Sequence, residues 1–539
     1  MSQTRRAFLR QVGAVGGAGV MLHSMGALGL TTAHAAETPP FTPLKSGDLS
    51  RVGGKSVVIL GGGIAGMTAA YELLKGGYQV TVLEGRDRPG GRNWTVRGGT
   101  TFTDLKGRSQ VARFSKGEYM NAGPGRIPQM HVTLDYCKEL GVPIEVFTNQ
   151  NADALLYREG PNAAGALKGV PTTHRAAKAD YHGYTSELLA KATDQGALNS
   201  YLTQQDKDRL IAYLRSFGAL GPKVEGDPAA SYKYAGGGRR GYDPEPAAGL
   251  EAGTPIPPAA MSDVFASGMG SYFSFEFGFD QAMMMYQPVG GMDRIAYAFA
   301  DAIGARNFRY SSTIVEYNNT ADGVEVIYAT PDGRKRITAD FAVNTMPPHI
   351  AAKVRSNLPA EIVTALGSVS VTNAGKIGIE YGRRWWEEDF RIYGGITNSD
   401  TDIGNTWHPS YGYHSDKGTM IGYYNTGGNA NVYGALDHPG RLDRAVMQGT
   451  KVFGDVYGRD ITASFSQDWV SAPFSEGAWV SWPSSSGGQT GERYESLLEP
   501  SGNVYFAGDH LSHAIAWQHG AMVAARATVE SLHTRVTAA

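Results

Sequence analysis

The first strong pattern along the chain is a short apolar run that leads into glycines and then into a helical repeat. Residues 55–60 (KSVVIL) are rich in β-branched side chains, which is typical of a strand buried in a parallel sheet. A helical pattern runs from Met67 to about Lys75, and a second strand pattern covers residues 78–83. This order of elements predicts a βαβ unit at the start of the folded protein.

The turn between the first strand and the helix has the spacing of a dinucleotide-binding motif. Gly61 permits a tight turn, Gly63 lets the backbone approach a pyrophosphate, and Gly66 lets the helix pack on the strand. Ile64 and Ala65 lie in the same segment, where the N-terminus of the helix presents N–H groups to phosphates. The spacing therefore predicts that this unit binds a dinucleotide.

The residues after the second strand bear on which dinucleotide is bound. Glu84 stands at the end of the strand, where a carboxylate accepts hydrogen bonds from both ribose hydroxyls of an adenosine. Gly85 and Arg86 follow, and a further turn ends in Gly91 and Arg92, which places a fixed cation beside the same pyrophosphate. NAD binding does not need this second Gly-Gly-Arg, although the residues alone leave NAD as an alternative to FAD.

This arrangement resembles the flavin-dependent amine oxidase superfamily, in which an acid followed by Gly-Gly-Arg comes after the glycine motif. The resemblance implies FAD and extends through residues 288–294 and the strand patterns that contain Ile314 and residues 341–347. Cys137 is far in sequence from the C-terminal flavin loop, so we expect non-covalent FAD without a link through cysteine, whereas a link through histidine stays open. Near the end of the chain, a strand pattern leads to Gly508 and Asp509. The family has an acid here, usually Glu, that accepts hydrogen bonds from the ribityl or phosphate part of the flavin.

Residues 121–131 (NAGPGRIPQMH) are similar to the Gly-Pro-x-Arg-x-Pro-x-x-His segment of L-amino acid oxidases. A planar guanidinium binds a carboxylate through two parallel hydrogen bonds, which Lys does not reproduce. The resemblance implies that Arg126 holds the substrate carboxylate and that Gly123 and Gly125 lie near the flavin. The alternative is that Arg126 only forms a salt bridge or contacts a flavin phosphate.

The resemblance implies that two further polar side chains belong to the same site. Tyr424, in the strand pattern 420–425, matches the tyrosine that bonds the substrate carboxylate, and Tyr423 then faces the opposite side. Lys376 is a lone cation in an apolar strand pattern and matches the lysine that holds a water near flavin N5 and assists the reaction with O2. A core tyrosine and a lysine that reaches solvent from an edge strand are the alternatives.

Several aromatic residues match walls of the family's active site. Trp517 corresponds to the wall against the substrate, and the carbonyl of Ala516 to the acceptor of the substrate amine. Trp469 corresponds to a tryptophan near the flavin ring, and Trp479 is a candidate for another wall, although buried tryptophan is often simple core. The run 273–286, with three consecutive methionines, either lines the entrance or packs in the core.

The resemblance implies oxidative deamination of L-amino acids, with hydride transfer from Cα to flavin N5 and reoxidation by O2. The products are a 2-oxo acid, ammonia and H2O2. No cation or acid in the sequence marks a pocket for a charged side chain, so we expect broad use of apolar and aromatic amino acids. The alternatives are a monoamine or polyamine oxidase, a monooxygenase that forms an amide, and a flavin-binding protein without catalysis.

Composition and the N-terminus place limits on partners and location. The formal net charge of the 539 residues is −2, without a basic stripe, so we expect no nucleic acid partner, and we predict no metal site. The single cysteine, Cys137, excludes an intramolecular disulfide and fits a buried apolar position. Arg5-Arg6 followed by a mildly apolar stretch predicts a twin-arginine signal over residues 1–35 and a periplasmic or secreted protein without stable membrane insertion.

The expected fold is α/β (α+β overall), with three interleaved domains. A homo-oligomer such as a dimer is compatible with this arrangement. The predicted boundaries are 1–35 for the signal, 52–100, 286–370 and 499–539 for a Rossmann-like FAD-binding domain, 101–150 and 371–498 for a mixed-sheet substrate domain, and 151–285 for a helical and loop insert over the entrance.

Overall fold

The computed structural model describes residues 44 and 52–538 of the chain, and the signal expected over residues 1–35 lies outside them. The first predicted unit is present: the fold begins with a strand, a helix and a second parallel strand. Both strands start one residue later than the patterns indicate, and helix α3 begins at Ile64, three residues before its periodic part. The helix starts earlier because its first turn contains Gly66, the last glycine of the motif.

A five-stranded parallel sheet holds the two ends of the chain together. Its strands in spatial order are β11 (Phe308–Arg309), β2 (Gln79–Leu83), β1 (Ser56–Leu60), β15 (Phe341–Asn344) and β24 (Val504–Phe506). In chain order, its first two strands, β1 and β2, come from the N-terminal part, and its last strand, β24, comes from near the C-terminus. The sheet is therefore complete only when segments far apart in the chain pair. An all-parallel sheet of this kind needs helices to cover its faces.

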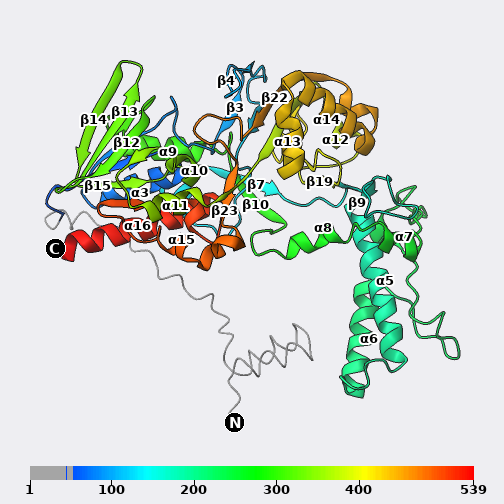
Figure 1. Ribbon diagram of the computed structural model, residues 1–539. Coiled ribbons are helices and arrows are strands. Elements are labelled where there is room, and N and C mark those ends of the chain that lie inside the picture. Colours follow the sequence, from blue (N-terminus) through cyan, green and yellow to red (C-terminus); the bar gives the residue numbers. More distant parts are fainter. Residues whose placement is uncertain (1–43, 45–51, 539) are drawn as a thin grey trace, which may run out of the picture.

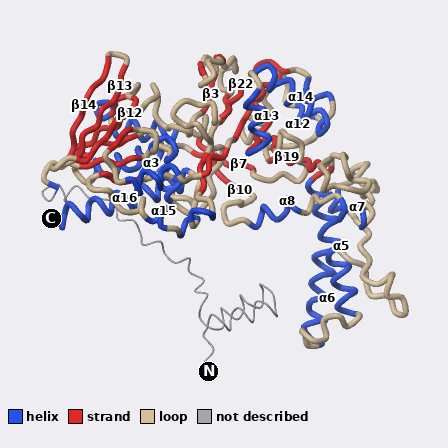
Figure 2. The backbone as a smooth tube through the Cα atoms, in the orientation of Figure 1, coloured by secondary structure: helices blue, strands red, loops and turns tan. Residues whose placement is uncertain are grey.

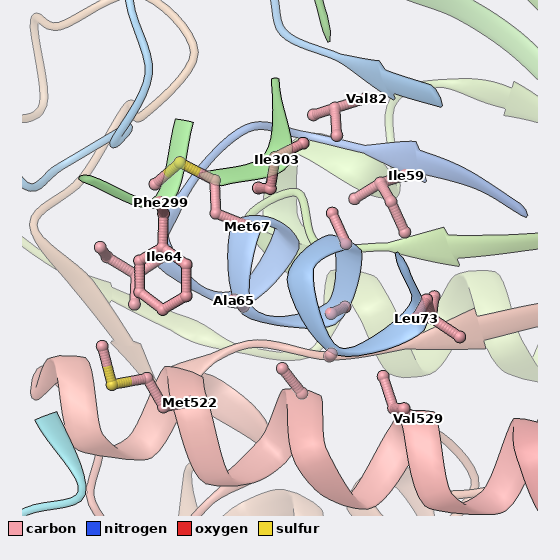
Figure 3. Close-up of a cluster of buried hydrophobic side chains, with 14 of the residues drawn as sticks. Ile59, Ile64, Ala65, Met67, Leu73, Val82, Phe299, Ile303, Met522 and Val529 are labelled. Carbon is pink, nitrogen blue, oxygen red and sulfur yellow. The ribbon is translucent and has the colours of Figure 1, made fainter. Parts of the chain in front are cut away.

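Three helices pack together with one face of this sheet, as Figure 3 shows. Met67 of α3 (Ile64–Lys75) lies near Phe299 of α9 (Arg294–Ile303), and Met522 and Val529 of α16 (Gln518–Ala538) lie along the other side of α3. These side chains are fully buried. Each such side chain contributes roughly 1.5–3 kcal/mol to folding, so this core fixes the strand ends at which the glycine motif lies.

A four-stranded sheet stands at the outer edge of the same region (Figure 1). Its order is β14 (Gly333–Ala339), β13 (Val324–Thr330), β12 (Thr313–Asn319) and β16 (Arg355–Ser356). In the chain, α10 (Pro348–Ala351) precedes β16 and α11 (Ala360–Gly367) follows it, and α15 (Glu492–Glu495) packs against α11. The β12 strand places Ile314 toward the parallel sheet, where it packs against that sheet's second core cluster.

The second large sheet has seven strands of mixed direction. Its spatial order is β22 (Ile461–Asp468), β18 (Ala374–Tyr381), β21 (Gly418–Thr426), β20 (Asn405–Trp407), β19 (Ile396–Ser399), β8 (Leu155–Tyr157) and β9 (Thr172–Thr173). Helices α12 (Trp385–Glu388), α13 (Gly427–Ala435) and α14 (His438–Phe453) lie on one side of it (Figure 1). Lys376 is on the inner strand β18, so it is not on an edge strand.

Residues 151–285 differ from the expected helical and loop insert at their beginning. Their first strands, β8 and β9, extend the seven-stranded sheet. Beyond them, α5 (His174–Asp194) and α6 (Gln204–Gly218) form a hairpin that projects away from the rest of the protein (Figures 1 and 2). The hairpin therefore starts at the edge of the second sheet, and its first residue, His174, lies at that base.

Short elements connect these parts. Helix α7 (Met261–Ala266) packs beside the hairpin, and α8 (Ser271–Ser274) leads back toward the body. The two-stranded ribbon of β7 (Ile144–Thr148) and β10 (Met284–Pro288) then returns the chain to the parallel sheet. Other short elements are β3 (Thr95–Arg97), β6 (Tyr119–Asn121), α4 (Thr133–Glu139), β17 (Ser370–Thr372) and β23 (Trp479–Ser481).

None of the helices in residues 52–538 combines the length and the apolar character that a membrane span requires.

Candidate active site

A long channel follows the carboxyl ends of the parallel strands. Gly61 comes directly after β1, Glu84 after β2 and Thr345 after β15, and all three line the channel together with Asp509, which follows β24. In open α/β sheets, ligands bind at this edge. The channel has a volume of about 270 Å³. Its position supports the predicted dinucleotide site.

The three motif glycines each have a steric reason. Gly61 has φ +116°, a conformation that L side chains rarely adopt. A Cβ on Gly66 would lie 2.0 Å from the carbonyl oxygen of Gly61, so only glycine lets the helix pack this closely. A Cβ on Gly63 would meet nothing within 4 Å, because this residue borders the open channel. Gly63 therefore leaves space for a ligand, whereas Gly66 serves the fold.

The carboxylate of Glu84 is held in place by the backbone. It accepts hydrogen bonds from the N–H of Gly62 and the N–H of Arg86, each at 2.8 Å. A carboxylate has about four acceptor positions, so these two bonds orient the group without using its full capacity. The Arg86 guanidinium donates to the carbonyl of Pro473 and the hydroxyl of Ser475 and lies 3.7 Å from Glu84 Oε1.

Arg92 and Asp509 contact each other, which differs from the separate roles expected for them. Arg92 donates to Asp509 Oδ1 at 2.6 Å and to the carbonyl of Ala478 at 2.6 Å. Asp509 also accepts from the N–H of Ala516 at 3.0 Å. Burial alone would raise the pKa of Asp509, but the nearby Arg92 charge and these hydrogen bonds hold it below its usual value. The pair thus ties the second glycine turn to the C-terminal loop.

Most of the predicted dinucleotide-binding residues line the channel, but Gly66, Gly125 and Arg126 do not. Gly66 packs beneath the turn, and the other two lie in the neighbouring cavity. The predicted residues that do line the channel are Gly61, Gly63, Ile64, Ala65, Glu84, Gly85, Arg86, Gly91, Arg92, Gly123, Ile314, Trp469, Gly508, Asp509, Ala516 and Trp517.

A second cavity, of about 630 Å³, adjoins the channel. The two spaces share wall residues, so they meet at one junction. All of the predicted catalytic residues line this cavity, and all except Arg126 lie at the junction. The residues common to both spaces are Gly123, Pro124, Lys376, Tyr424, Trp479, Ala516 and Trp517. A reaction between a bound dinucleotide and a second molecule would take place at this junction.

Arg126 contributes a cation to the wall of the cavity. Its guanidinium donates to Gln281 Oε1 at 3.2 Å and lies over the Trp407 ring, with 4.9 Å between the guanidinium carbon and the ring centroid. The loss of hydration lowers the pKa of Arg126 to about 10, so the group stays charged at neutral pH. A Cβ on the neighbouring Gly125 would lie 2.5 Å from the Trp407 ring, so glycine permits this stacking.

Lys376 is a buried cation that contacts Trp407, the ring over which Arg126 also lies. Its Nζ donates to the carbonyls of Asn121 and Gly123, and it lies 4.5 Å from the Trp407 ring centroid and 4.9 Å from that of Tyr424. Burial, with the Arg126 charge as a second cause, lowers the pKa of Lys376 to about 7. This lysine therefore exchanges a proton near neutral pH at the junction.

The pairing of two strands sets which tyrosine reaches the site. Lys376 on β18 is directly opposite Tyr424 on β21. Tyr424 faces the cavity, whereas Tyr423 packs against Tyr433 on the other side of the sheet, with ring centroids 4.4 Å apart. Burial raises the pKa of Tyr424, although the Arg126 charge opposes the shift, so its hydroxyl keeps its proton as a hydrogen-bond donor.

Comparison with known proteins identifies the family of this chain. The model of the flavin-containing amine oxidoreductases matches residues 64–533. The chain belongs to this family. The L-amino-acid oxidase of Protobothrops flavoviridis is 27% identical over 488 residues, which cover 86% of this chain and 86% of that protein. That of Notechis scutatus scutatus is 24% identical over 474 residues, which cover 86% and 84%.

Solved structures agree on the fold. The cyclohexylamine oxidase of Brevibacterium oxydans IH-35A has a TM-score of 0.59 at 18% identity and covers 89% of this chain and 99% of its own. A putrescine oxidase bound to putrescine has a TM-score of 0.58 at 18% identity, with the same coverage. At this identity the likeness shows the fold alone.

The channel of this flavin-containing amine oxidoreductase fits a flavin. Its lining includes the glycine motif and Glu84 and also the wide indole ring of Trp469, and Trp517 lies at the junction. Trp469 is buried and donates from Nε1 to the carbonyl of Ala122 at 3.0 Å. Ala516 has φ +68° and is held there by its N–H bond to Asp509. A strained residue of this kind at a junction is typical of a functional site.

Sequence reasoning missed several residues of the site. Trp407 stacks against both cations, and Gln281 contacts Arg126, but neither belongs to a motif. Within the run 273–286, Gln281 lines the cavity, whereas the three methionines line neither space, and Met285 is core.

Proposed function

We propose that this protein uses FAD to oxidise L-amino acids to 2-oxo acids, ammonia and H2O2. The single observation that carries the proposal is the position of Arg126 and Tyr424 together in a cavity that meets the dinucleotide channel. A carboxylate bound there would place its own α-carbon near the junction. The names of the relatives at 24–27% identity support the same activity.

Arg126 is suited to bind the substrate carboxylate. Its planar fork forms two parallel hydrogen bonds with a carboxylate, and the Tyr424 hydroxyl is available as a third donor. The aromatic face of Trp407 holds the guanidinium in place before substrate binds. Because the surroundings are poorly hydrated, the attraction between the two charges is stronger than it would be in water.

The remaining junction residues orient the amine. In the proposal, the Ala516 carbonyl accepts a hydrogen bond from the neutral amine, and Trp517 forms a wall beside it. A bound flavin would supply the acceptor for the electrons of the Cα–H bond and the means of their transfer to O2. Most of the rate enhancement then comes from position. Since the amine must lose its proton, activity rises with pH until this deprotonation is complete.

Lys376 is proposed to assist the oxygen reaction. It is the one proposed catalytic group with a pKa of about 7, and it lies at the junction of both spaces. An ammonium there stabilises negative charge that develops on reduced oxygen, and it can return a proton.

We also propose that FAD is bound without a covalent link and that the protein is exported by the twin-arginine route. Cys137 is buried in the core around α4 and lines neither space, and burial raises the pKa of its thiol to about 12. Release of FAD by acid precipitation tests the first point, and the fractionation of cells that express the full chain tests the second.

The test of the function is anaerobic mixing of the purified flavoprotein with L-amino acids, D-amino acids and simple amines. Bleaching of the flavin by L-amino acids, followed by a 2-oxo acid and peroxide on aeration, supports the proposal. Bleaching by tyramine or spermidine but by no amino acid would assign an amine oxidase. An amide in place of the 2-oxo acid would assign a monooxygenase, and no bleaching at all would assign a binding protein.

A further inference from the structure

The part of the cavity away from the junction is lined mainly by polar side chains. The residues that line the cavity but not the channel include a histidine and several amides, in addition to Arg126 and Trp407. The polar residues with side chains suited to a substrate's side chain are Asn149, Gln150, His174, Tyr272, Asn398 and Asn405. An apolar substrate side chain would leave those of these groups that lack a protein partner without water as well, which is unfavourable.

His174 is the most informative of these residues. It is the first residue of α5, its side chain is 7% exposed, and its ring packs edge-on against Phe273 with centroids 5.1 Å apart. Its backbone N–H donates to the carbonyl of Ala154 at 2.8 Å, which fixes the start of the helix. Among the described residues neither ring nitrogen forms a hydrogen bond, and the charges of Glu276 and Lys178 act on the ring from outside the lining. A neutral imidazole has one N–H donor and one acceptor nitrogen, and here both remain available to a ligand.

Asn149 adds a second buried polar group without a full set of partners. It is 3% exposed, and its Oδ1 has no hydrogen-bond partner among the described residues. The amides of Asn398 and Asn405, by contrast, bond each other at 2.6 Å. Buried polar atoms in folded proteins are nearly all paired, so the unpaired Oδ1 of this wall residue adds to the unsatisfied polar groups beside the cavity.

The charges of the wall restrict the ligand further. Arg126, Lys376 and His174 are the basic residues of the lining, and none of the lining residues that the structure describes is Asp or Glu. The side chain of a lysine or arginine substrate would bring a third cation into a cavity whose lining already has two, and no carboxylate of the described lining would bind it. A side chain that ends in an oxygen acceptor has neither problem.

We propose that this cavity selects L-amino acids whose side chain ends in a carboxamide or carboxylate, and that His174 is the specificity-determining donor. Glutamine and glutamate are substrates of this class. The inference rests on the proposed function, since it takes the α-carboxylate to lie at Arg126. It replaces the expectation of broad use of apolar and aromatic amino acids.

The experiment compares kcat/KM for glutamine, glutamate, methionine, leucine and lysine in the holoenzyme. Methionine and glutamine have side chains of similar length, so their ratio isolates the polar end. We expect glutamine or glutamate to exceed methionine, leucine and lysine by at least about tenfold, because sites built to bond a polar group discriminate strongly against analogues that lack it. Which of the two leads distinguishes a carboxamide from a carboxylate.

Variants of two histidines on the same helix make the test specific. H174L should lower kcat/KM for the preferred substrate by about 10- to 100-fold, mainly through KM, and change that for methionine by less than about threefold. H174N keeps a donor and should restore part of the loss. The control is H182L, because His182 stacks on Phe217 on the projecting hairpin and lines neither space. H182L should leave the ratios unchanged.

The possible failures are distinguishable. If the wild type turns over leucine or methionine as well as glutamine and glutamate, or if H174L leaves the glutamine-to-methionine ratio unchanged, the specificity inference is wrong while the proposed function stands. If no amino acid bleaches the flavin and amines do, the proposed function itself is wrong. Flavin content and melting temperature of H174L show whether the variant is folded, and H174N provides the second measurement if it is not.

Discussion

The channel and the cavity meet at one junction, but they are built in different ways. The channel is formed largely by backbone and glycines at strand ends, and its charged groups hold one another: Glu84 bonds two backbone N–H groups, and Arg92 bonds Asp509. The cavity is formed by side chains from distant segments, with two cations around the Trp407 ring. A prearranged backbone suits a constant cofactor, whereas a cavity of side chains suits a variable substrate.

The largest effect expected from this contrast is on substrate binding. R126A should raise KM for amino acids by about 30- to 4000-fold, which corresponds to about 2–5 kcal/mol for one partner of a buried charge pair. The flavin should stay bound, because Arg126 does not line the channel. R126K keeps the charge but not the planar fork of two donors, so its KM should lie between those of the wild type and R126A. Steady-state peroxide assays measure KM, and the flavin spectrum measures how much cofactor stays bound. Loss of flavin from R126A would contradict the separation of the cofactor channel from the substrate cavity.

Two glycines of the channel provide a matched pair. G63A should leave the apoprotein stable but weaken cofactor binding by about 5- to 150-fold, since its Cβ would meet no protein atom and would enter the space for the ligand. G66A should instead destabilise the fold, because its Cβ would lie 2.0 Å from the Gly61 carbonyl oxygen. FAD titration and thermal unfolding of the apoproteins separate the two outcomes. Equal losses of stability would show that Gly63 is also structural.

Lys376 allows the oxygen reaction to be separated from the amino acid reaction. K376M should slow reoxidation by O2 by about tenfold and leave flavin reduction by the amino acid nearly unchanged, as removal of one proton-transfer group typically lowers a rate by this order or more. Stopped-flow measurements of the two half-reactions check this. An equal slowing of both would place Lys376 in substrate binding.

The same lysine predicts a pH effect on stability. Its pKa is about 7 in the folded protein and roughly 10.4 in the unfolded chain, so the unfolded state binds more protons between these values. Stability of the wild type should therefore rise with pH from about 7 to about 10, by at most about 1.4 kcal/mol per pH unit from this group. K376M should lack that contribution. Thermal unfolding of both proteins at pH 7 and pH 9 measures the difference, and parallel changes would contradict the assigned burial.

Tyr424 should have the smallest effect. Y424F removes one neutral donor, which contributes about 0.5–1.5 kcal/mol, so KM for the amino acid should rise by about 2- to 12-fold. Y423F is the control, because Tyr423 packs on the opposite side of the sheet. Similar changes in KM for both variants would show that the effect is transmitted through the strand and is not a contact with substrate.

The same contrast explains what the sequence could predict. Gly61, Glu84 and the strand that precedes Asp509 form local patterns with fixed spacing, so the channel follows from short stretches of chain. The partnership of Arg92 with Asp509 was not predictable, because the two residues are 417 positions apart and meet only through the parallel sheet. The Arg126 segment indicated a carboxylate site from its flanking glycine and proline.

The cavity walls were less accessible to sequence reasoning. Trp407 lies on a strand of only three residues. His174 is the first residue of α5, and no sequence pattern near it indicates that this helix projects from the rest of the protein. Gln281 lies just before β10, which pairs with β7, and its side chain contacts Arg126, 155 residues away in the chain. Their roles depend on which distant segments fold together. The pattern of residues 151–285 also did not indicate that β8 and β9 would join the large sheet.

The most direct measurement for the carboxylate clamp compares each amino acid with the amine that lacks only its carboxylate. We predict that kcat/KM for L-glutamine and L-leucine exceeds that for 4-aminobutanamide and 3-methylbutylamine by at least about a hundredfold, and that the ratio falls to near one in R126A. Equal turnover of acid and amine by the wild type, or an unchanged ratio in R126A, would contradict the assignment of Arg126 to the substrate.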